Sequence, residues 1–561
     1  MKILFKILAG LIVVALIVYG CNQRSERKLR LAVDGLRQEL HREGYRTDLS
    51  EFNLAVTEEV RRRTETIIAA GQALREMRLI GQLELMQPVG TNVALRTVPL
   101  EKISPPYPLY GQTNTDPDLW LLLEAELDKC QKELDSASQA LFEGEFQFEP
   151  QERGGNFLLP YLADVKKLAL AFSERAVLEL HEHQPNEAFT NLLALTRLVT
   201  AWKPEPMEIS HLVRFGCVGI ARRALWETTQ TAGLNEVQYL ALQREWEAMR
   251  VFDGLADTAA LSRASMVKMC QLTRAEKFTD DAGSWGATFS QAGRILFSAP
   301  QRSFQELWWR VQSYHQFASY QGKGSYEDEK ALLLYFRERE SEMKQALTWT
   351  NWVQMRGLPG VTNLIVFQGA KQSRIGVMMN LKQMGLGFVS QGRRFLSRAA
   401  ETEALRRVIV TAIALERYFL QHSNYPPVLV ELVPKYLSTV PVDFIDGREL
   451  HYRLGNDGRF ILYSIGLDGF DNGGQHVTAE SLADDAWTYG RGFETIRPPA
   501  DMDLVWPLPA IQSEVDRYQK VVAEKEAELE AMRKHAGELV PVLDPEMERL
   551  MRARYGLPVE K

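Results

Sequence analysis

Cysteine is scarce in this sequence, and its spacing excludes a common kind of metal site. The 561 residues contain four cysteines, Cys21, Cys130, Cys217 and Cys270, and no two of them form a CxxC pair. A structural zinc site is therefore not expected. If Cys21 is modified, as argued below, three thiols remain, and an odd number does not make a disulfide framework. We interpret Cys130, Cys217 and Cys270 as buried free thiols, because unbridged cysteine is mostly a small core residue.

Positive charge is not in excess either. Lys and Arg number 66 against 73 Asp and Glu, so the formal net charge at pH 7 is -7. Proteins that bind nucleic acid usually carry a basic excess, so we do not expect a nucleic acid partner. Hydrophobic residues make up 45% of the chain, and its 11 Trp and 24 Phe argue against wholesale disorder. A chain of this length can build about two to four domains.

The short motifs that mark common active sites are missing. No GxSxG, HExxH, phosphate-binding loop or GxGxxG sequence is present, and Gly385-Leu386-Gly387 is followed by Ser390 where a third glycine is needed. His181-Glu182-His183 could suggest a metal site, but its two histidines point apart at a helix end, which favours a solvated turn. No catalytic residue is assigned. A site assembled from distant residues is an alternative that the sequence leaves open.

An uninterrupted apolar run lies close to the N-terminus, from Ile7 to Gly20, after the basic Lys2 and Lys6. A signal peptide has this layout of a short basic segment followed by an apolar one. A full membrane span needs about 20 apolar residues, and the run is shorter. It is long enough for an uncleaved anchor if it extends back to Ile3 and the Lys6 amine reaches the membrane surface.

The end of this run resembles the lipobox of bacterial lipoproteins. The sequence there is Val18-Tyr19-Gly20-Cys21, in which Tyr19 is larger than the residue usual at its place. The resemblance implies cleavage before Cys21 and lipidation of its thiol. A lipoprotein, an uncleaved anchor and a cleaved soluble chain all stay open. Charge does not decide the orientation, because basic residues also follow the run. The export-like start favours a bulk that faces the periplasm.

Helical periodicity dominates the next part of the chain. Residues 24–156 predict helices interrupted by a Pro-rich connector, and residues 157–390 predict a series of helices with polar breaks between them. Two such breaks lie at His181 to Asn186 and at Lys203 to Pro206. Helices joined by short loops pack as antiparallel neighbours. We therefore interpret residues 157–390 as a domain of irregular helical hairpins.

The pattern changes near Ala399. One helix is predicted from there to His422, followed by a short apolar helix and then by two strands, Glu449 to Leu454 and Arg459 to Ser464. Asn456-Asp457-Gly458 between the strands is a hairpin turn signal. A loop rich in Gly and Asp follows the second strand.

The order of these segments resembles the globular head of type II secretion pseudopilins, especially the major one. The resemblance covers about residues 399–490 and implies a long helix against a small antiparallel sheet. Unlike a pilin, this chain has a long stretch of other protein before the helix, so we expect a borrowed module rather than a subunit of a pseudopilus. The matching segments are Leu415-Glu416-Arg417-Tyr418, Asn424-Tyr425-Pro426, Leu432-Val433-Pro434-Lys435-Tyr436-Leu437, Val440-Pro441 and Tyr463-Ser464-Ile465-Gly466-Leu467-Asp468-Gly469.

The same resemblance implies calcium binding by the Gly/Asp-rich loop. Calcium takes several oxygen ligands, and clustered carboxylates supply them. Asp468 and Asp471 are the candidates for a first arm, and Asp484 and Asp485 for a second. The alternative is that the Asp side chains only cap turns.

Together these patterns predict a mostly α fold with a small C-terminal α+β, pseudopilin-like domain. We expect a non-enzymatic scaffold or interaction protein of the bacterial cell envelope, held to the membrane by its N-terminus and bound to a protein partner. An atypical component of a type II secretion or pilus-like system and an envelope hydrolase with a non-local active site are the alternatives. The predicted divisions are a signal segment (1–23), a helical region (24–156), a hairpin domain (157–390), the head (391–495), and a Pro-rich connector with a charged helix that is either solvated or a short coiled coil (496–561).

Overall fold

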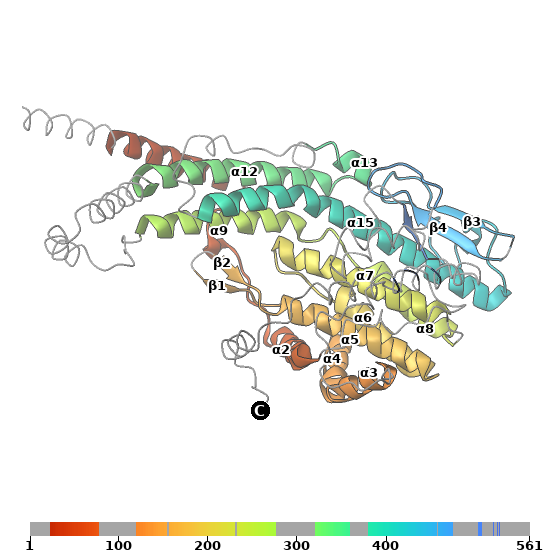
Figure 1. Cartoon of the computed structure of the whole chain (residues 1–561). Helices are drawn as coiled ribbons and strands as arrows, with labels where there is room; N and C mark the ends of the chain where they lie inside the picture. The colour runs from red at the N-terminus through yellow and green to blue at the C-terminus, as the bar shows by residue number, and fades with distance from the viewer. Residues whose placement is uncertain are drawn as a thin grey trace, which may run out of the picture.

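The computed structural model is mostly helical, as predicted, with two small antiparallel sheets (Figure 1). The predicted signal segment and nearly all of the predicted C-terminal charged helix lie outside the described residues. Among the described helices, none combines the length and apolarity that a membrane span requires. The structure describes residues 23–77, 119–153, 156–230, 233–275, 320–358, 380–456, 458–474 and 503–507, and residues 520, 524 and 527.

A bundle of helical hairpins forms the middle of the molecule. α5, α6 and α7 pack on one another, and α2 packs on α4. The Asn235 side chain accepts from the Gln238 N–H at 3.0 Å, which caps α8. The bundle helices are α2 (Glu58–Ala73), α3 (Leu119–Asp128), α4 (Gln131–Glu143), α5 (Leu162–His181), α6 (Pro185–Thr200), α7 (Glu208–Gln230) and α8 (Glu236–Ala248).

Three long helices form a second assembly, here called the stalk. They are the helix of residues 23–42, named the first stalk helix, with α9 (Leu255–Ala275) and α12 (Ser325–Ala346). Figure 1 shows the first stalk helix in red beside α12. The three meet in a small core of their own, made by Val33, Leu40, Val267 and Leu333.

The C-terminal unit contains the predicted helix and hairpin. α15 (Asn380–His422) packs on β4, and β3 (His451–Leu454) pairs antiparallel with β4 (Phe460–Ser464), so the predicted strands are confirmed. β5 (Leu504–Val505) adds a third strand beside β4, with Tyr463 opposite Val505. Residues 504 and 505 fall in the predicted Pro-rich connector (496–561), whereas in the structure they form a strand of the sheet.

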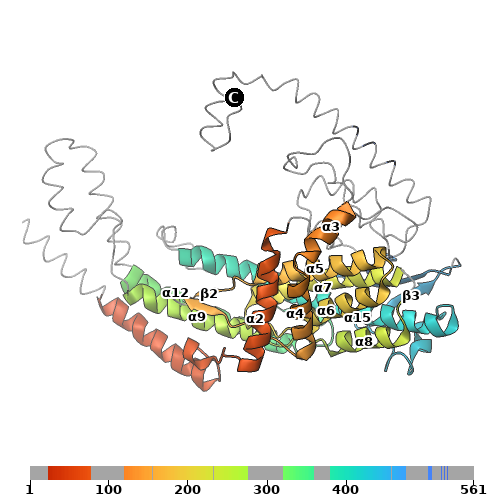
Figure 2. The same ribbon diagram turned by 90° about the horizontal axis from the view of Figure 1, so that it is seen from below.

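One hydrophobic core continues from the bundle into the C-terminal unit, from Ile67 of α2 to Trp506. The Gln243 amide of α8 donates to the Tyr436 carbonyl at 2.8 Å, and the Arg222 guanidinium of α7 donates to the Val505 carbonyl at 3.2 Å. In both views the first stalk helix lies at one end of the molecule and β3 at the other (Figures 1 and 2). The predicted domain limits stay predictions, and the units on either side of residue 390 share this core.

Three local features were not predicted in this form. Cys130 is not helical and separates α3 from α4, and its thiol donates to the Leu127 carbonyl at 3.3 Å. The short helix predicted after Pro427 is a 3₁₀ turn, Leu429–Leu432. A hairpin of β1 (Gln151–Arg153) and β2 (Asn156–Leu158) is additional. The three remaining cysteines are buried free thiols, as predicted.

Candidate functional site

The Gly/Asp-rich loop leaves the end of β4 and folds back on itself in tight turns. Asp468 accepts from the Phe470 N–H at 3.2 Å, and Asp471 accepts from the Gly473 N–H at 2.8 Å. Asp471 also accepts from the Tyr463 hydroxyl at 3.0 Å. Asp468 and Asp471, the two predicted ligands of the first arm, therefore cap turns, which is the alternative that the sequence left open.

Asp503 is a loop residue that sequence reasoning missed. Its side chain is buried and accepts from the Asn472 N–H at 3.3 Å and from the Gly474 N–H at 2.7 Å. Gly474 has a φ of 68°, and a Cβ there would come within 2.7 Å of the Tyr463 ring, so only glycine fits. Asp503, which lies directly before β5, thus holds the Gly/Asp-rich loop in place. Its only sequence signal was an Asp directly before Leu504-Val505-Trp506.

Three carboxylates of this loop act on one another. Burial raises the pKa of Asp503, and the neighbouring Asp471 and Asp468 raise it further, against the lowering by the two backbone N–H groups. The Gly473 N–H lowers the pKa of Asp471, with smaller contributions from Tyr463 and from His451, whose Nδ1 lies 3.4 Å from an Asp471 oxygen. Three acidic side chains therefore lie close together at this end of the sheet, next to the basic side chains of His451 and Arg453.

The predicted metal site is only partly visible. Asp484, Asp485 and the lipidation candidate Cys21 lie outside the described residues. Within the described ranges, no group of three or more His, Cys, Asp or Glu side chains is arranged to hold a metal ion. Asp468 and Asp471 would therefore need further ligands, and calcium binding stays a prediction.

The short helix α13 (Trp352–Met355) holds the loop from outside the sheet. The Trp352 indole donates to the Leu467 carbonyl at 3.1 Å, and the Arg356 guanidinium donates to the Asp468 carbonyl at 3.2 Å. The backbone N–H of Trp352 also donates to the Phe444 carbonyl at 2.8 Å. The segment that follows α12 is in this way attached to the C-terminal unit.

The stalk is held together by a buried carboxylate. The Glu329 side chain of α12 is fully buried and accepts from Arg37 Nε of the first stalk helix at 2.6 Å. Arg274 of α9 pairs with the other oxygen of the same carboxylate, and its guanidinium lies 4.2 Å from the centre of the Tyr326 ring. One carboxylate therefore links all three stalk helices.

A second buried charge fixes the chain where the first stalk helix ends. The Arg263 side chain of α9 is fully buried, and its Nη1 lies 2.8 Å from a Glu340 oxygen of α12. Its Nε donates to the Arg46 carbonyl at 2.7 Å, directly after the first stalk helix. Burial lowers the pKa of Arg263, and Glu340 opposes that shift.

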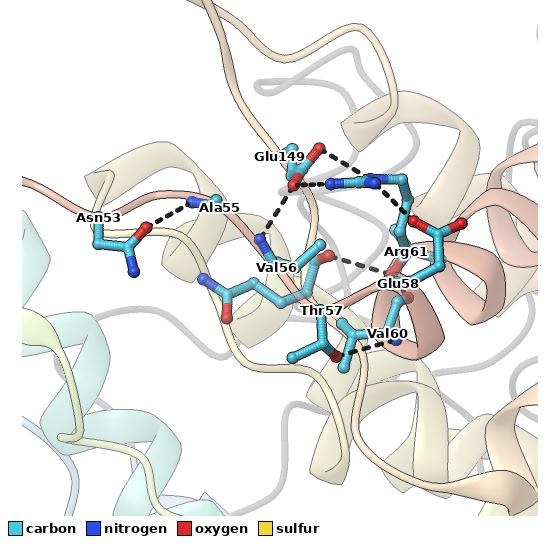
Figure 3. A network of polar contacts seen from close by, with 10 residues as sticks. Asn53, Ala55, Val56, Thr57, Glu58, Val60, Arg61 and Glu149 are labelled. Carbon is cyan, nitrogen blue, oxygen red and sulfur yellow. Dashed lines mark hydrogen bonds and ion pairs between the residues drawn. The ribbon is translucent and has the colours of Figure 1, made fainter.

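The segment between the first stalk helix and α2 is also tied to the bundle. Figure 3 shows Glu149 at the centre of this network. Glu149 accepts from the Val56 N–H at 2.9 Å and from Arg61 Nη2 at 3.1 Å, and Arg61 Nη1 donates to Glu58 at 2.7 Å. Thr57 caps α2 by accepting from the Val60 N–H. The first stalk helix therefore continues into the bundle through hydrogen-bonded backbone.

A buried polar cluster that the sequence did not indicate lies at the start of α7. Glu205 is fully buried and accepts from the Phe148 N–H at 3.0 Å. Burial raises the pKa of Glu205 to about 7, against the lowering by backbone N–H groups such as that of Phe148. Burial and the charge of Glu205 also raise the pKa of Tyr161. Glu205 Oε2, Tyr161 OH and Ser210 Oγ have no hydrogen-bond partner among the residues described.

His211 follows Ser210 directly in α7. It is fully buried, and its ring is 5.7 Å from that of Phe395, centre to centre. Burial lowers the pKa of His211 to about 3, and Arg214 adds to the lowering, so its imidazole is neutral. A carboxyl with a pKa near 7 and a neutral imidazole are groups that a hydrolase can use. Both are closed off from solvent in this conformation.

Comparisons of the chain with protein-family models, with curated proteins and with solved structures found no match. The resemblance of the C-terminal unit to pseudopilin heads therefore stays a prediction that rests on the motifs quoted above.

Proposed function

We propose that this protein is a non-enzymatic scaffold of the bacterial cell envelope, tethered by its N-terminal segment and rigid from the tether to the far sheet. The observation that carries the proposal is the shared Glu329 carboxylate, which builds the first stalk helix into the body. Only Cys21 and Asn22 separate that helix from the apolar run. A tether fused to a fixed body suits a protein that holds a partner at a set place.

The rest of the molecule supports the same role. The hydrogen bonds of Glu149 and Arg263 hold the segment between the first stalk helix and α2 in place. The hydrophobic core that the bundle shares with the C-terminal unit extends to Trp506. The acidic loop and β3 lie at the end opposite the first stalk helix (Figure 2). On this proposal the far end carries the surface that binds a periplasmic protein partner.

Fractionation of a bacterial host that expresses the full chain tests the tether. We expect the protein in the membrane fraction after a high-salt wash, and accessible to protease from the periplasmic side. A matched chain whose residues 1–22 are replaced by a cleavable export signal should be released in soluble form. Release of the wild-type chain as well would contradict the proposal. The intact mass of the membrane-bound protein separates the two tethered forms, because only a lipoprotein begins at Cys21 and carries lipid there, and Cys21→Ser should abolish that cleavage and lipid.

A role in a type II secretion or pilus-like system is the second candidate. The packing of α15 on β4 supports a pseudopilin-like head. The same helix also packs on α7 and α8, and Arg406 and Arg417 bond it to α8. A helix covered in this way is not free to enter a fibre, which favours a scaffold beside such a system. Unchanged secretion in a deletion strain would remove this candidate.

We also propose that the acidic loop binds calcium, together with ligands outside the described residues. The proximity of Asp468, Asp471 and Asp503 supports this, because a divalent cation would relieve their repulsion. We expect a chelator to lower the melting temperature of the full chain and calcium to restore it. Asp471→Asn should abolish the calcium shift, and Asp135→Asn on α4 should not. A melting temperature indifferent to calcium would refute the site.

The hydrolase alternative points to the cluster at the start of α7. If the protein is a scaffold, Glu205→Gln and His211→Leu should leave the cellular role intact when the variants replace the wild-type chain at equal abundance. Loss of that role with the fold and abundance preserved would favour the hydrolase.

A further inference from the structure

The exposed start of the first stalk helix carries a basic face, and no carboxylate of the described residues forms an ion pair with it. Arg24, Arg27 and Lys28 are all exposed. Arg27 and Lys28 follow Arg24 by three and four residues, so the three side chains lie on one side of the helix. Leu31 continues this face and is 63% exposed. This side is named the basic face.

The opposite side of the same helix is the one that packs in the stalk. Val33 and Leu40 lie about half a turn away from the basic face and are buried. Glu26 also lies there: its carboxylate is so close to Gly322 that a Cβ at Gly322 would come within 2.9 Å of it. The acid nearest in sequence to the three cations is therefore directed into the stalk and does not neutralise the basic face.

The basic face lies next to the predicted tether. The apolar run ends at Gly20, and the helix rises about 1.5 Å per residue, so the face occupies about the first 12 Å of the stalk. Basic residues that directly follow a membrane-inserted segment lie at the level of the lipid headgroups and are attracted to anionic lipids. An exposed leucine among them can enter the interface between headgroups and acyl chains.

We propose that Arg24, Arg27 and Lys28 bind the anionic headgroups of the membrane that holds the N-terminal segment, with Leu31 at the same surface. The inference rests on the proposed tether. A nucleic acid is a poorer occupant, because three cations give little affinity and the chain as a whole is negative. The adjacent apolar run makes lipid the occupant that these residues already face.

Partition of the full chain between buffer and lipid vesicles tests the proposal. Vesicles of phosphatidylcholine alone are compared with vesicles that also contain phosphatidylglycerol. Three cations at the surface should raise partition into the anionic vesicles about 100-fold. The triple variant Arg24→Gln, Arg27→Gln, Lys28→Gln should lose most of this gain and keep the wild-type partition into neutral vesicles. In about 1 M salt, where the Debye length is about 3 Å, the gain should disappear.

A control variant with the same change in net charge distinguishes the effect of the basic face from the effect of the total charge of the chain. Arg62, Lys203 and Arg448 are exposed cations of the bundle and the C-terminal unit, with 68%, 63% and 86% of their side chains exposed. The triple variant Arg62→Gln, Lys203→Gln, Arg448→Gln should keep the increase in partition into anionic vesicles. Equal loss in both triple variants, or no loss in either, overturns the basic face as the lipid site. Failure of the wild-type chain to bind either kind of vesicle would instead refute the tether itself.

Discussion

The indole N–H of Trp226 donates a hydrogen bond to the carbonyl of Pro507 at 2.8 Å, although 281 residues separate the two in sequence. Trp226 is fully buried in α7, and Pro507 follows β5. The Trp506 N–H in turn donates to the Leu462 carbonyl of β4 at 2.8 Å. Residues 503–507 therefore fasten the sheet to the bundle, and the C-terminal unit docks as part of one body.

Removing this contact should loosen the docking. Trp226→Phe keeps an aromatic ring but leaves the buried Pro507 carbonyl without its donor, so we expect a loss of about 1–3 kcal/mol in the free energy of unfolding. Urea unfolding of the full chain measures it. Trp246 is a matched control, because it is also fully buried and its Nε1 has no partner in the described part of the chain. Equal losses for Trp226→Phe and Trp246→Phe would mean that the hydrogen bond contributes nothing.

Local signals let the sequence predict elements better than it predicts the site. The turn at Asn456 to Gly458 sits between its own two strands, so the hairpin could be predicted from neighbours in sequence. Asp503 serves a loop about 30 residues earlier, and the pairing of Arg37 with Glu329 spans 292 residues. The hydrophobic periodicity of a sequence does not indicate contacts between residues so far apart. The burial of Glu205 likewise depends on how α5, α6 and α7 pack.

The raised pKa of Glu205 predicts a protein that loses stability as the pH rises. The folded carboxyl holds its proton up to about pH 7, whereas the unfolded one releases it near its ordinary pKa of 4.5. The folded state therefore binds more protons between these values, so the free energy of unfolding falls as the pH rises through this window. Glu205→Gln should be more stable than wild type by up to about 3 kcal/mol at about pH 8, and the gain should vanish near pH 4.5.

Glu403 supplies the control of opposite sign. Burial acts to raise the pKa of Glu403, but Arg406 and Arg407 outweigh burial and lower it. Its contribution is present above the unfolded pKa and is lost as the pH falls. Glu403→Gln should therefore destabilise the chain at about pH 8, where Glu205→Gln stabilises it. Urea unfolding of both variants across the pH range checks the signs, and a common sign would contradict the assignment.

His211 predicts a loss of stability in acid. Its folded pKa is about 3, against 6.5 unfolded, so only the unfolded state takes up a proton between these values and stability falls as the pH drops below 6.5. His211→Leu removes this group, so its unfolding free energy relative to wild type should rise by roughly 3 kcal/mol or more from about pH 7 to about pH 4. A difference between the two chains that does not change with pH would show that His211 does not stay neutral.

The stalk offers the most direct test of the rigid tether. Glu329→Gln leaves Arg37 and Arg274 facing each other without a carboxylate in a closed seam, and breaking a buried pair in this way should cost about 3–5 kcal/mol. Arg337→Gln is the matched control, because Arg337 of α12 pairs with Glu39 of the first stalk helix at 3.7 Å and with Glu43 directly after it at 2.6 Å, but its side chain is 33% exposed. Loss of the exposed pair should cost about 1 kcal/mol or less.

Hydrogen exchange of residues 23–42 in the full chain gives the second readout: Glu329→Gln should speed exchange in the first stalk helix, and Arg337→Gln should leave it near wild type. Unchanged exchange in Glu329→Gln would mean that the shared carboxylate does not hold the first stalk helix, and the rigid connection between the tether and the body would be lost with it.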